Sequence, residues 1–149
     1  MKRLCVYLTY DKQRIIDRYI GYMLKELRSC MCRLVVVCNM PEVVCGEEIL
    51  KEYADEIFYR ENIGFDAGGF KEALCSFIGW EMLSTYDELV LANDSFFGPF
   101  RNMDSIFRDM DKRDCDFWGL TRHAYKKTEE RTIPEHLQSY FLVIRSPML

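Results

Sequence analysis

Short apolar runs and segments with helical spacing alternate along this chain. Residues 3–10 (RLCVYLTY) are mostly apolar, which is typical of a strand covered on both faces. In residues 15–27, apolar side chains recur at three- and four-residue steps, which predicts an amphipathic helix. Residues 33–38 (RLVVVC) predict a second buried strand, closed by a turn at Asn39 and Pro41.

The same alternation continues toward the C-terminus. The further predicted elements are a helix at 47–54, a strand at 56–59, a glycine-bearing loop at 62–69 leading into a helix that ends near residue 78, a strand at 88–92, a helix at 103–110, and strands at 117–120 and 140–144. Strands that alternate with helices predict an α/β fold with a mostly parallel central sheet and helices on both faces.

Length and composition indicate one globular domain spanning residues 1–149. Hydrophobic residues make up 49% of the chain and charged residues 30%, a balance typical of a folded protein. The chain stops soon after its last predicted strand, without a helix to cover it. We therefore expect it to be truncated at the C-terminus, as a fragment of a longer protein.

Charge and cysteine usage narrow the class of protein. The formal net charge is -4, so no overall basic field favours nucleic acid as a partner. No apolar run approaches the roughly 20 residues of a membrane span, and the N-terminus lacks a signal-peptide pattern, so we expect a cytoplasmic protein. Cys5, Cys38 and Cys75 lie in apolar stretches, which predicts buried, reduced thiols. Cys30 and Cys32 lack a second pair at zinc-site spacing.

Polar clusters follow the ends of four predicted strands. Ligands of open α/β sheets bind beyond the carboxyl ends of the strands, so these clusters together predict a nucleotide site. The candidate residues are Asp11 after the first strand, Asn39 after the second, Asn62, Gly64, Asp66, Gly68 and Gly69 after the third, and Asn93, Asp94 and Ser95 after the fourth.

Each cluster also has a structural alternative. Asp11 is a good helix cap, and Asn39 beside Pro41 is a good turn former. Gly68 and Gly69 would let a helix approach the sheet closely, and their spacing is not that of the G-x-G-x-x-G dinucleotide motif. Residues 93–95 could simply form a strand-ending turn. The joint placement of the clusters is what favours a ligand.

The later residues carry weaker signals. His123 and His136 lie in a polar connection and are typical of surface residues rather than a catalytic pair. The basic residues of this connection alternate with glutamates, which indicates a solvated face. The aromatic side chains suit either the core or a pocket wall. The basic residues are Arg122, Lys126, Lys127 and Arg131. The aromatic residues are Phe96, Phe97, Phe100, Phe117 and Trp118.

Four stretches resemble a known family. They are ENIGFDAGGFKEAL (61–74), YDELVLANDSFFGPF (86–100), FWGLT (117–121) and HLQSYFLVIRS (136–146). They are similar to the rhamnan synthesis F proteins, which are glycosyltransferase-like proteins of rhamnose-polysaccharide and lipopolysaccharide O-chain assembly in bacteria. The resemblance implies a Rossmann-like sandwich of the GT-A type. It also implies transfer of a sugar, rhamnosyl from dTDP-rhamnose, to a growing cell-surface glycan acceptor.

The resemblance also implies roles for individual residues. In proteins with this fold a D-x-D-type motif ends a central strand and holds Mn²⁺ or Mg²⁺ against the diphosphate. Asp94 is then the candidate metal ligand, and Ser95 stands where many relatives have a second carboxylate. Asn62 and Asp66 would face the nucleotide, and Asn39 would lie near the base.

The departures from that motif leave two questions open. A hard cation prefers several carboxylate or phosphate oxygens, so a single Asp leaves metal dependence unsettled. The catalytic base of such transferases usually comes from later in the fold, where Asp116, Glu135 and His136 are candidates.

Two other classes of protein remain to be weighed. For the protein in either case we expect peripheral association with membrane assembly machinery at the inner face of the membrane. One of the two classes is a non-catalytic interaction module within a polysaccharide-assembly complex. The other is a flavodoxin-like domain, which is disfavoured because no phosphate-cradling loop follows the first strand.

Overall fold

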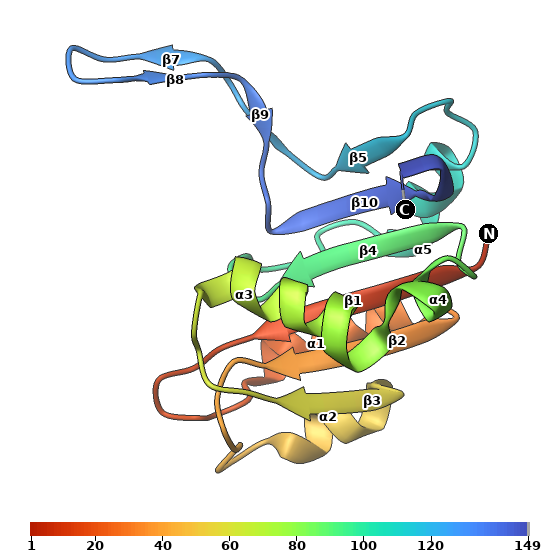
Figure 1. The fold of residues 1–149 in the computed structure, drawn as a ribbon, viewed down its shortest axis with the longest axis vertical. Coiled ribbons are helices and arrows are strands. Elements are labelled where there is room, and N and C mark those ends of the chain that lie inside the picture. The colour runs from red at the N-terminus through yellow and green to blue at the C-terminus, as the bar shows by residue number, and fades with distance from the viewer. Residues whose placement is uncertain (149) are drawn as a thin grey trace.

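The computed structural model describes residues 1–148 and contains one six-stranded sheet, ordered β3-β2-β1-β4-β10-β5 (Figure 1). Its strands are β1 (Arg3–Thr9), β2 (Arg33–Cys38), β3 (Glu56–Tyr59), β4 (Glu88–Asn93), β5 (Phe117–Gly119) and β10 (Phe141–Arg145). β1 to β4 run parallel, whereas β10 is antiparallel to both β4 and β5. The α/β class is therefore confirmed, with a mixed sheet.

Helices cover both faces of the sheet, as predicted. One face carries α1 (Arg18–Arg28), α2 (Glu47–Tyr53) and α5 (Met103–Met110). The other carries α3 (Phe65–Glu72), the π-helical turn η1 (Ala73–Ile78) and α4 (Trp80–Leu83). Successive residues of β1 alternate between the two cores, so all seven are buried. This explains why the strand is apolar almost without interruption.

The strand order creates a switch point between β1 and β4. From β1 the chain adds β2 and β3 on one side and then returns to place β4 on the other side. The connections that leave the carboxyl ends of β1 and β4 therefore go in opposite directions. In open α/β sheets, the crevice at such a point is the usual place for a ligand.

Two predicted boundaries near the switch point were wrong. The first helix begins at Arg18 rather than at residue 15, because Ile15 forms a bridge with Cys45 and Ile16 is buried in the preceding loop. The predicted loop at 62–69 is shorter, because α3 already begins at Phe65. Asp66, Gly68 and Gly69 are therefore helical residues.

A two-part β-hairpin arm connects β5 to β10 and was predicted only as a polar connection. It consists of β6 (Arg122–His123), β7 (Lys126–Lys127), β8 (Thr132–Ile133) and β9 (His136–Leu137), with β6 paired to β9 and β7 to β8. The arm projects away from the sheet (Figure 1). After β10, the 3-10 turn η2 (Ser146–Met148) follows. No helix among residues 1–148 is long and apolar enough to cross a membrane.

The expectation of buried thiols holds for Cys5 and Cys38, where burial raises the pKa of each thiol. It was wrong for Cys75, which is exposed on η1. An apolar neighbourhood in the sequence did not predict burial there, because η1 packs Ala73, Leu74 and Phe77 against the sheet instead.

Candidate functional site

The carboxyl ends of β1 and β4 are joined by the side chain of Asp94. Asp94 Oδ2 accepts hydrogen bonds from Thr9 Oγ1 at 2.7 Å and from the backbone N–H of Tyr10 at 2.9 Å. The hydroxyl of Tyr19, on α1, donates to the Asp94 carbonyl at 3.5 Å. Asp94 is thus held at the switch point by groups from β1, from the residue that follows β1 and from α1.

Asn93 joins the same strand end to α3. It is only 3% exposed, and its Nδ2 donates to Asp66 Oδ2 at 2.6 Å. Its Oδ1 accepts from the backbone N–H of Ser95 at 3.1 Å. The predicted stretches 62–69 and 93–95 therefore lie against each other, although they are far apart in the sequence. Through this contact Asp66 places a second carboxylate near Asp94, which the Asn93-Asp94-Ser95 motif itself lacks.

The electrostatics of Asp94 follow from this crowding. Burial raises the pKa of the Asp94 carboxyl above its usual range, because the charged form loses solvation. The negative charge of Asp66 acts in the same direction, whereas the hydrogen bonds from Thr9 and Tyr10 lower the pKa. A carboxylate placed this way favours a bound cation or a hydrogen-bond donor.

Asn39 supports α3 rather than facing open space. It is 1% exposed, its Nδ2 donates to the carbonyl of Phe65 at 3.4 Å, and its Oδ1 accepts from Arg60. Arg60 also donates to the carbonyl of Ile63 at 2.8 Å and to Glu72 at 2.7 Å. The contact of Asn39 with a nucleotide base remains a prediction, and the observed contacts give it a positioning role.

The glycines allow α3 to lie close to the sheet. A Cβ on Gly69 would be 2.2 Å from Leu8 Cδ1, and a Cβ on Gly68 would be 2.2 Å from the carbonyl oxygen of Ile63. Gly64 has a φ of 77°, a left-handed conformation that favours glycine. The close approach of helix and sheet considered for Gly68 and Gly69 is thus confirmed for Gly69, whereas Gly68 lies against the loop that precedes α3. Asn62 Oδ1, nearby, is buried without a hydrogen-bond partner among the described residues.

Asp11 and Ser95 lie at the margin of this arrangement. The Asp11 carboxylate accepts hydrogen bonds from the backbone N–H groups of Gln13 at 2.7 Å and Ile15 at 3.2 Å, so it caps the loop before α1. Ser95 is exposed directly after the β4 end. Within residues 1–148, no three side chains of the His, Cys, Asp and Glu types gather in a metal-binding group.

One of the three candidate bases is far from Asp94, and the other two lie on the hairpin arm. Asp116 precedes β5, which runs in the same direction as β4, so Asp116 is at the opposite end of the sheet. Glu135 pairs with Arg122 on the hairpin arm at 2.6 Å. The ring of His136 stacks on that of His123 with centroids 5.2 Å apart; His136 is exposed, as predicted for a surface residue, and His123 is half-buried.

Sequence reasoning missed two residues of the cluster, Tyr19 and Arg60. Arg60 directly follows β3, and this position after a strand end was the available signal. Tyr19 matched a helical apolar pattern, which hid the polar use of its hydroxyl group. Burial and the charge of Asp94 raise the pKa of that hydroxyl.

Family comparison agrees with the resemblance seen in the sequence. The match to the family described as Rhamnan synthesis protein F covers residues 34–149, which is most of the chain and includes β4, α3 and Asp94, whereas Thr9, Tyr10 and Tyr19 precede it. The chain belongs to the Rhamnan synthesis protein F family.

Two curated relatives span nearly the whole chain. The "Virulence protein VirA" of Vibrio anguillarum is 24% identical over 139 residues, which cover 93% of this chain and 41% of that protein. The "Uncharacterized protein y4gN" of Sinorhizobium fredii is 28% identical over 140 residues, which cover 93% of this chain and 34% of that protein. The chain therefore spans less than half the length of these relatives.

Proposed function

We propose that this chain is the nucleotide-sugar-binding domain of a glycosyltransferase that builds a rhamnan-type polysaccharide, with a GT-A-type fold. The donor is dTDP-rhamnose and the acceptor is the growing glycan. The observation that carries the proposal is the pairing of Asp94 with Thr9 at the β1–β4 switch point, with Asp66 of α3 beside it. Family membership supports the same chemistry.

The nucleotide would lie across the carboxyl ends of β1 and β4. α3 begins at Phe65, next to the carboxylates, and the N-terminus of a helix attracts phosphate through its free N–H groups and its dipole. Asn62 offers a buried carbonyl oxygen without a partner in the described chain, suited to a donor group on the base or ribose. Asp11 and Asn39 hold the surrounding loops in place.

The residues present fit a divalent cation that is completed by substrate. Mg²⁺ is usually held by one or two carboxylates together with phosphate oxygens and waters. Asp94 and Asp66 provide two carboxylates whose mutual repulsion a cation would relieve. Neither hydrogen bond to Asp94 uses Oδ1. When bound, the cation would neutralise charge on the leaving diphosphate.

The proposed reaction is a substitution at C1 of the sugar. The acceptor oxygen forms a bond to C1, and the bond between C1 and the diphosphate oxygen breaks, with its electron pair leaving on dTDP. The acceptor proton passes to a general base. The chain's own residues bind and orient the donor: Thr9 and Tyr10 fix the Asp94 carboxylate, and Asn93 fixes Asp66.

One observation favours a second candidate, a non-catalytic interaction module that retains the fold. Asp116 lies at the opposite end of the sheet and the carboxylate of Glu135 is paired with Arg122, so neither carboxylate is a free base beside Asp94. The two candidates differ in what they require of Asp94. A transferase needs it for the donor, whereas a docking module does not.

Calorimetric titration with dTDP-rhamnose and Mn²⁺ separates these candidates. We expect saturable binding by the unmodified protein and a loss of affinity of at least about tenfold in Asp94→Ala, since a charge-assisted contact is lost. Asp114→Ala, which removes an exposed carboxylate elsewhere, should bind like the unmodified protein.

The other outcomes are equally informative. Binding that is the same in Asp94→Ala and the unmodified protein would overturn the placement of the donor at this cluster. No binding of dTDP-rhamnose, dTDP or UDP by folded protein would overturn the transferase and leave the interaction module. Tight binding of UDP alone would keep the site and change the donor.

A further inference from the structure

Two histidines face each other within the hairpin arm. β6 pairs with β9 so that His123 lies directly opposite His136. Their rings are nearly parallel, with an interplanar angle of 5° and centroids 5.2 Å apart. His136 is exposed and His123 is half-buried, so solvent reaches the pair. The sequence contains two histidines in all, and both belong to this pair.

The hydrogen bonds of the two rings leave the same nitrogen free in each. Nδ1 of His123 lies 2.7 Å from the carbonyl oxygen of Ala124, and Nδ1 of His136 lies 2.8 Å from the carbonyl oxygen of Pro134. A carbonyl oxygen only accepts hydrogen bonds, so each Nδ1 carries a proton and donates it. In the neutral form of each ring, Nε2 is therefore the nitrogen with the lone pair. Among residues 1–148, neither Nε2 has a hydrogen-bond partner.

The two acceptor carbonyls also orient the rings in the same sense. Ala124 follows β6 and Pro134 precedes β9, so both carbonyls belong to the connections that lead toward β7 and β8. Because both Nδ1 atoms face this side and the rings are parallel, the two Nε2 atoms lie on the same side of the pair. Two lone pairs are thus presented next to each other.

Two neighbouring imidazole nitrogens are a ligand set for a transition metal. Imidazole suits Zn²⁺, Cu²⁺ and Ni²⁺, whereas Mg²⁺ and Mn²⁺ prefer oxygen ligands. Histidines that bind metal usually donate their other ring N–H to a carbonyl or carboxylate, which fixes the ring and raises its basicity. Both rings of this pair already have that hydrogen bond. A Zn–N bond is about 2.0–2.1 Å long, so an inward tilt of the rings would bring both Nε2 atoms onto one ion.

The arginine next to the pair is directed away from it. Arg122 and His123 are consecutive in β6, so their side chains point to opposite faces of the strand. Arg122 pairs there with Glu135 at 2.6 Å. Its charge is therefore balanced on the face that the histidines do not use.

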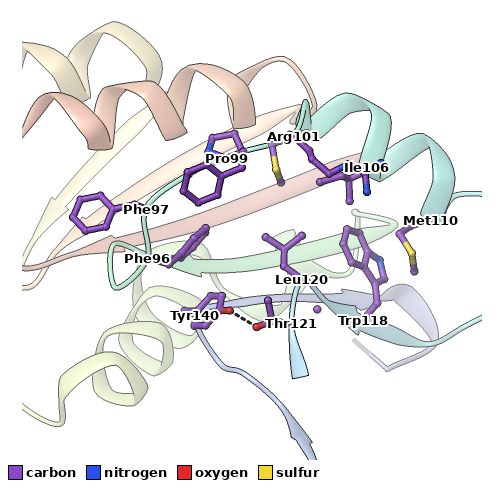
Figure 2. A pocket seen from close by; sticks show the side chains of 14 residues that line it. Phe96, Phe97, Pro99, Arg101, Ile106, Met110, Trp118, Leu120, Thr121 and Tyr140 are labelled. Carbon is purple, nitrogen blue, oxygen red and sulfur yellow. Dashed lines mark hydrogen bonds between the residues drawn. The ribbon is translucent and has the colours of Figure 1, made fainter. Parts of the chain in front are cut away.

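Uncharged groups border the pair on the side toward the sheet. The backbone N–H of Gln138 donates to the Thr121 carbonyl at 3.1 Å, and these residues lie two positions from His136 and His123, on the same face. Figure 2 shows the hydroxyls of Thr121 and Tyr140 bonded to each other, and both also contact Gln138 Oε1, at 2.6 and 3.0 Å. This network supplies no carboxylate, so water would complete the coordination of an ion at the pair.

We propose that His123 and His136 form a two-imidazole site for Zn²⁺, which links β6 to β9 through the Nε2 atoms. The site is separate from the proposed donor site, where Asp94 and Asp66 offer oxygen ligands. β6 and β9 are each two residues long, and such short two-stranded pairs are marginally stable in water. An ion that binds only the paired strands would hold the arm in this conformation.

Nitrogen NMR of protein labelled with ¹⁵N in histidine tests the site directly. The two imidazoles give all the side-chain signals, and the seven free cysteines, which are alternative Zn²⁺ ligands, are not observed. During titration with ZnCl₂ at mildly alkaline pH, where protons compete least, both Nε2 signals should shift with one dissociation constant. Both Nδ1 atoms should stay protonated. Mg²⁺ at the same concentrations should shift neither ring.

Phenylalanine substitutions remove one ligand and keep an aromatic ring in the stack. In His136→Phe, and separately in His123→Phe, the affinity of the remaining imidazole for Zn²⁺ should fall by at least about tenfold, because the second contact is no longer intramolecular. Tyr125→Phe alters an exposed residue of the same arm and should bind Zn²⁺ like the unmodified protein.

Amide hydrogen exchange of Gln138 tests the link between the strands, because its N–H donates across the β6–β9 pairing to Thr121. Zn²⁺ at about ten times its dissociation constant should slow this exchange about tenfold in the unmodified protein and leave it unchanged in His136→Phe. A shift of one imidazole alone, two different dissociation constants, or no shift at about 1 mM Zn²⁺ would overturn the site. Heat of Zn²⁺ binding without any imidazole shift, as cysteine ligands would produce, would overturn it as well.

Discussion

The side-chain amide of Asn93 donates a 2.6 Å hydrogen bond to the carboxylate of Asp66 and so joins the end of β4 to the first turn of α3. Asn93 is buried and satisfies the backbone N–H of Ser95 with its other side-chain atom. The candidate site therefore has a fixed internal link that does not depend on a ligand.

This link should be measurable as a coupling energy. Asn93→Ala is expected to lower the free energy of unfolding by roughly 1–3 kcal/mol, because it leaves buried polar groups without partners. In a double-mutant cycle with Asp66→Ala, urea unfolding should give a coupling of about 0.5–3 kcal/mol. The matched cycle of Asn93→Ala with Asp114→Ala, an exposed residue, should be additive. Additivity in both cycles would show that the Asn93–Asp66 contact contributes nothing.

The raised pKa of Asp94 predicts a pH dependence of stability. Because the pKa is higher in the folded protein, folding favours the protonated form. The resulting stabilisation is complete below the unfolded pKa of about 3.9 and is lost as the pH rises through the folded value. Asp94→Asn, which remains neutral, should therefore gain stability relative to the unmodified protein between about pH 3 and pH 7.

Urea unfolding across that pH range, without metal or nucleotide, checks the sign. Asp66→Asn should reduce the effect, because the charge of Asp66 contributes to the raised pKa of Asp94. If the unmodified protein instead gains stability relative to Asp94→Asn as the pH rises, the pKa of Asp94 is lowered and the electrostatic account of the site is wrong.

The contact between α3 and the sheet requires a residue without a Cβ at position 69. A Cβ there would lie 2.2 Å from Leu8 Cδ1 and 3.1 Å from Asn39 Oδ1, so Gly69→Ala must displace the helix or its neighbours. Thermal or urea unfolding should show a loss of about 1–3 kcal/mol. Ala67→Ser, at an exposed position of the same helix, should change stability by about 0.5 kcal/mol or less. Equal effects of the two substitutions would contradict the close approach.

Much of the sheet could be predicted from the sequence, because buried parallel strands such as β2 are continuous apolar runs. The start of α1 at Arg18 could not be predicted from the sequence. Ile16 is buried in the loop before this helix, and its position fits the helical spacing only by coincidence. The hairpin arm was missed because its short paired strands are polar and exposed, so no alternation marks them.

Part of the candidate site could also be predicted from the sequence. Position after a strand end identified Asn93, Asp94 and the segment that contains Asp66. It could not show that Asp66 would supply the second carboxylate, since that depends on how α3 packs across the sheet. The family resemblance suggested Asp116 as a base, and the direction of β5 places that residue at the opposite end.

At the end of the sheet opposite Asp94, we expect Glu88 to be the position most sensitive to substitution. Its side chain is fully buried and receives Arg3 Nε at 2.6 Å and Arg145 Nε at 2.9 Å. Glu88→Gln leaves two arginines beside a neutral group, and the free energy of unfolding should fall by about 3–5 kcal/mol. The matched control Glu81→Gln alters an exposed carboxylate and should change stability by about 0.5 kcal/mol or less. A loss of similar size in both variants would contradict the buried network.

The most direct test of the central claim is a map of backbone amide chemical shifts during titration with dTDP and Mg²⁺. The account predicts that residues 9–11, 62–69 and 93–95 shift together and follow one common dissociation constant, because they border a single nucleotide site. Shifts confined to the opposite end of the sheet near Glu88 and Asp116, or no shifts in folded protein, would contradict it.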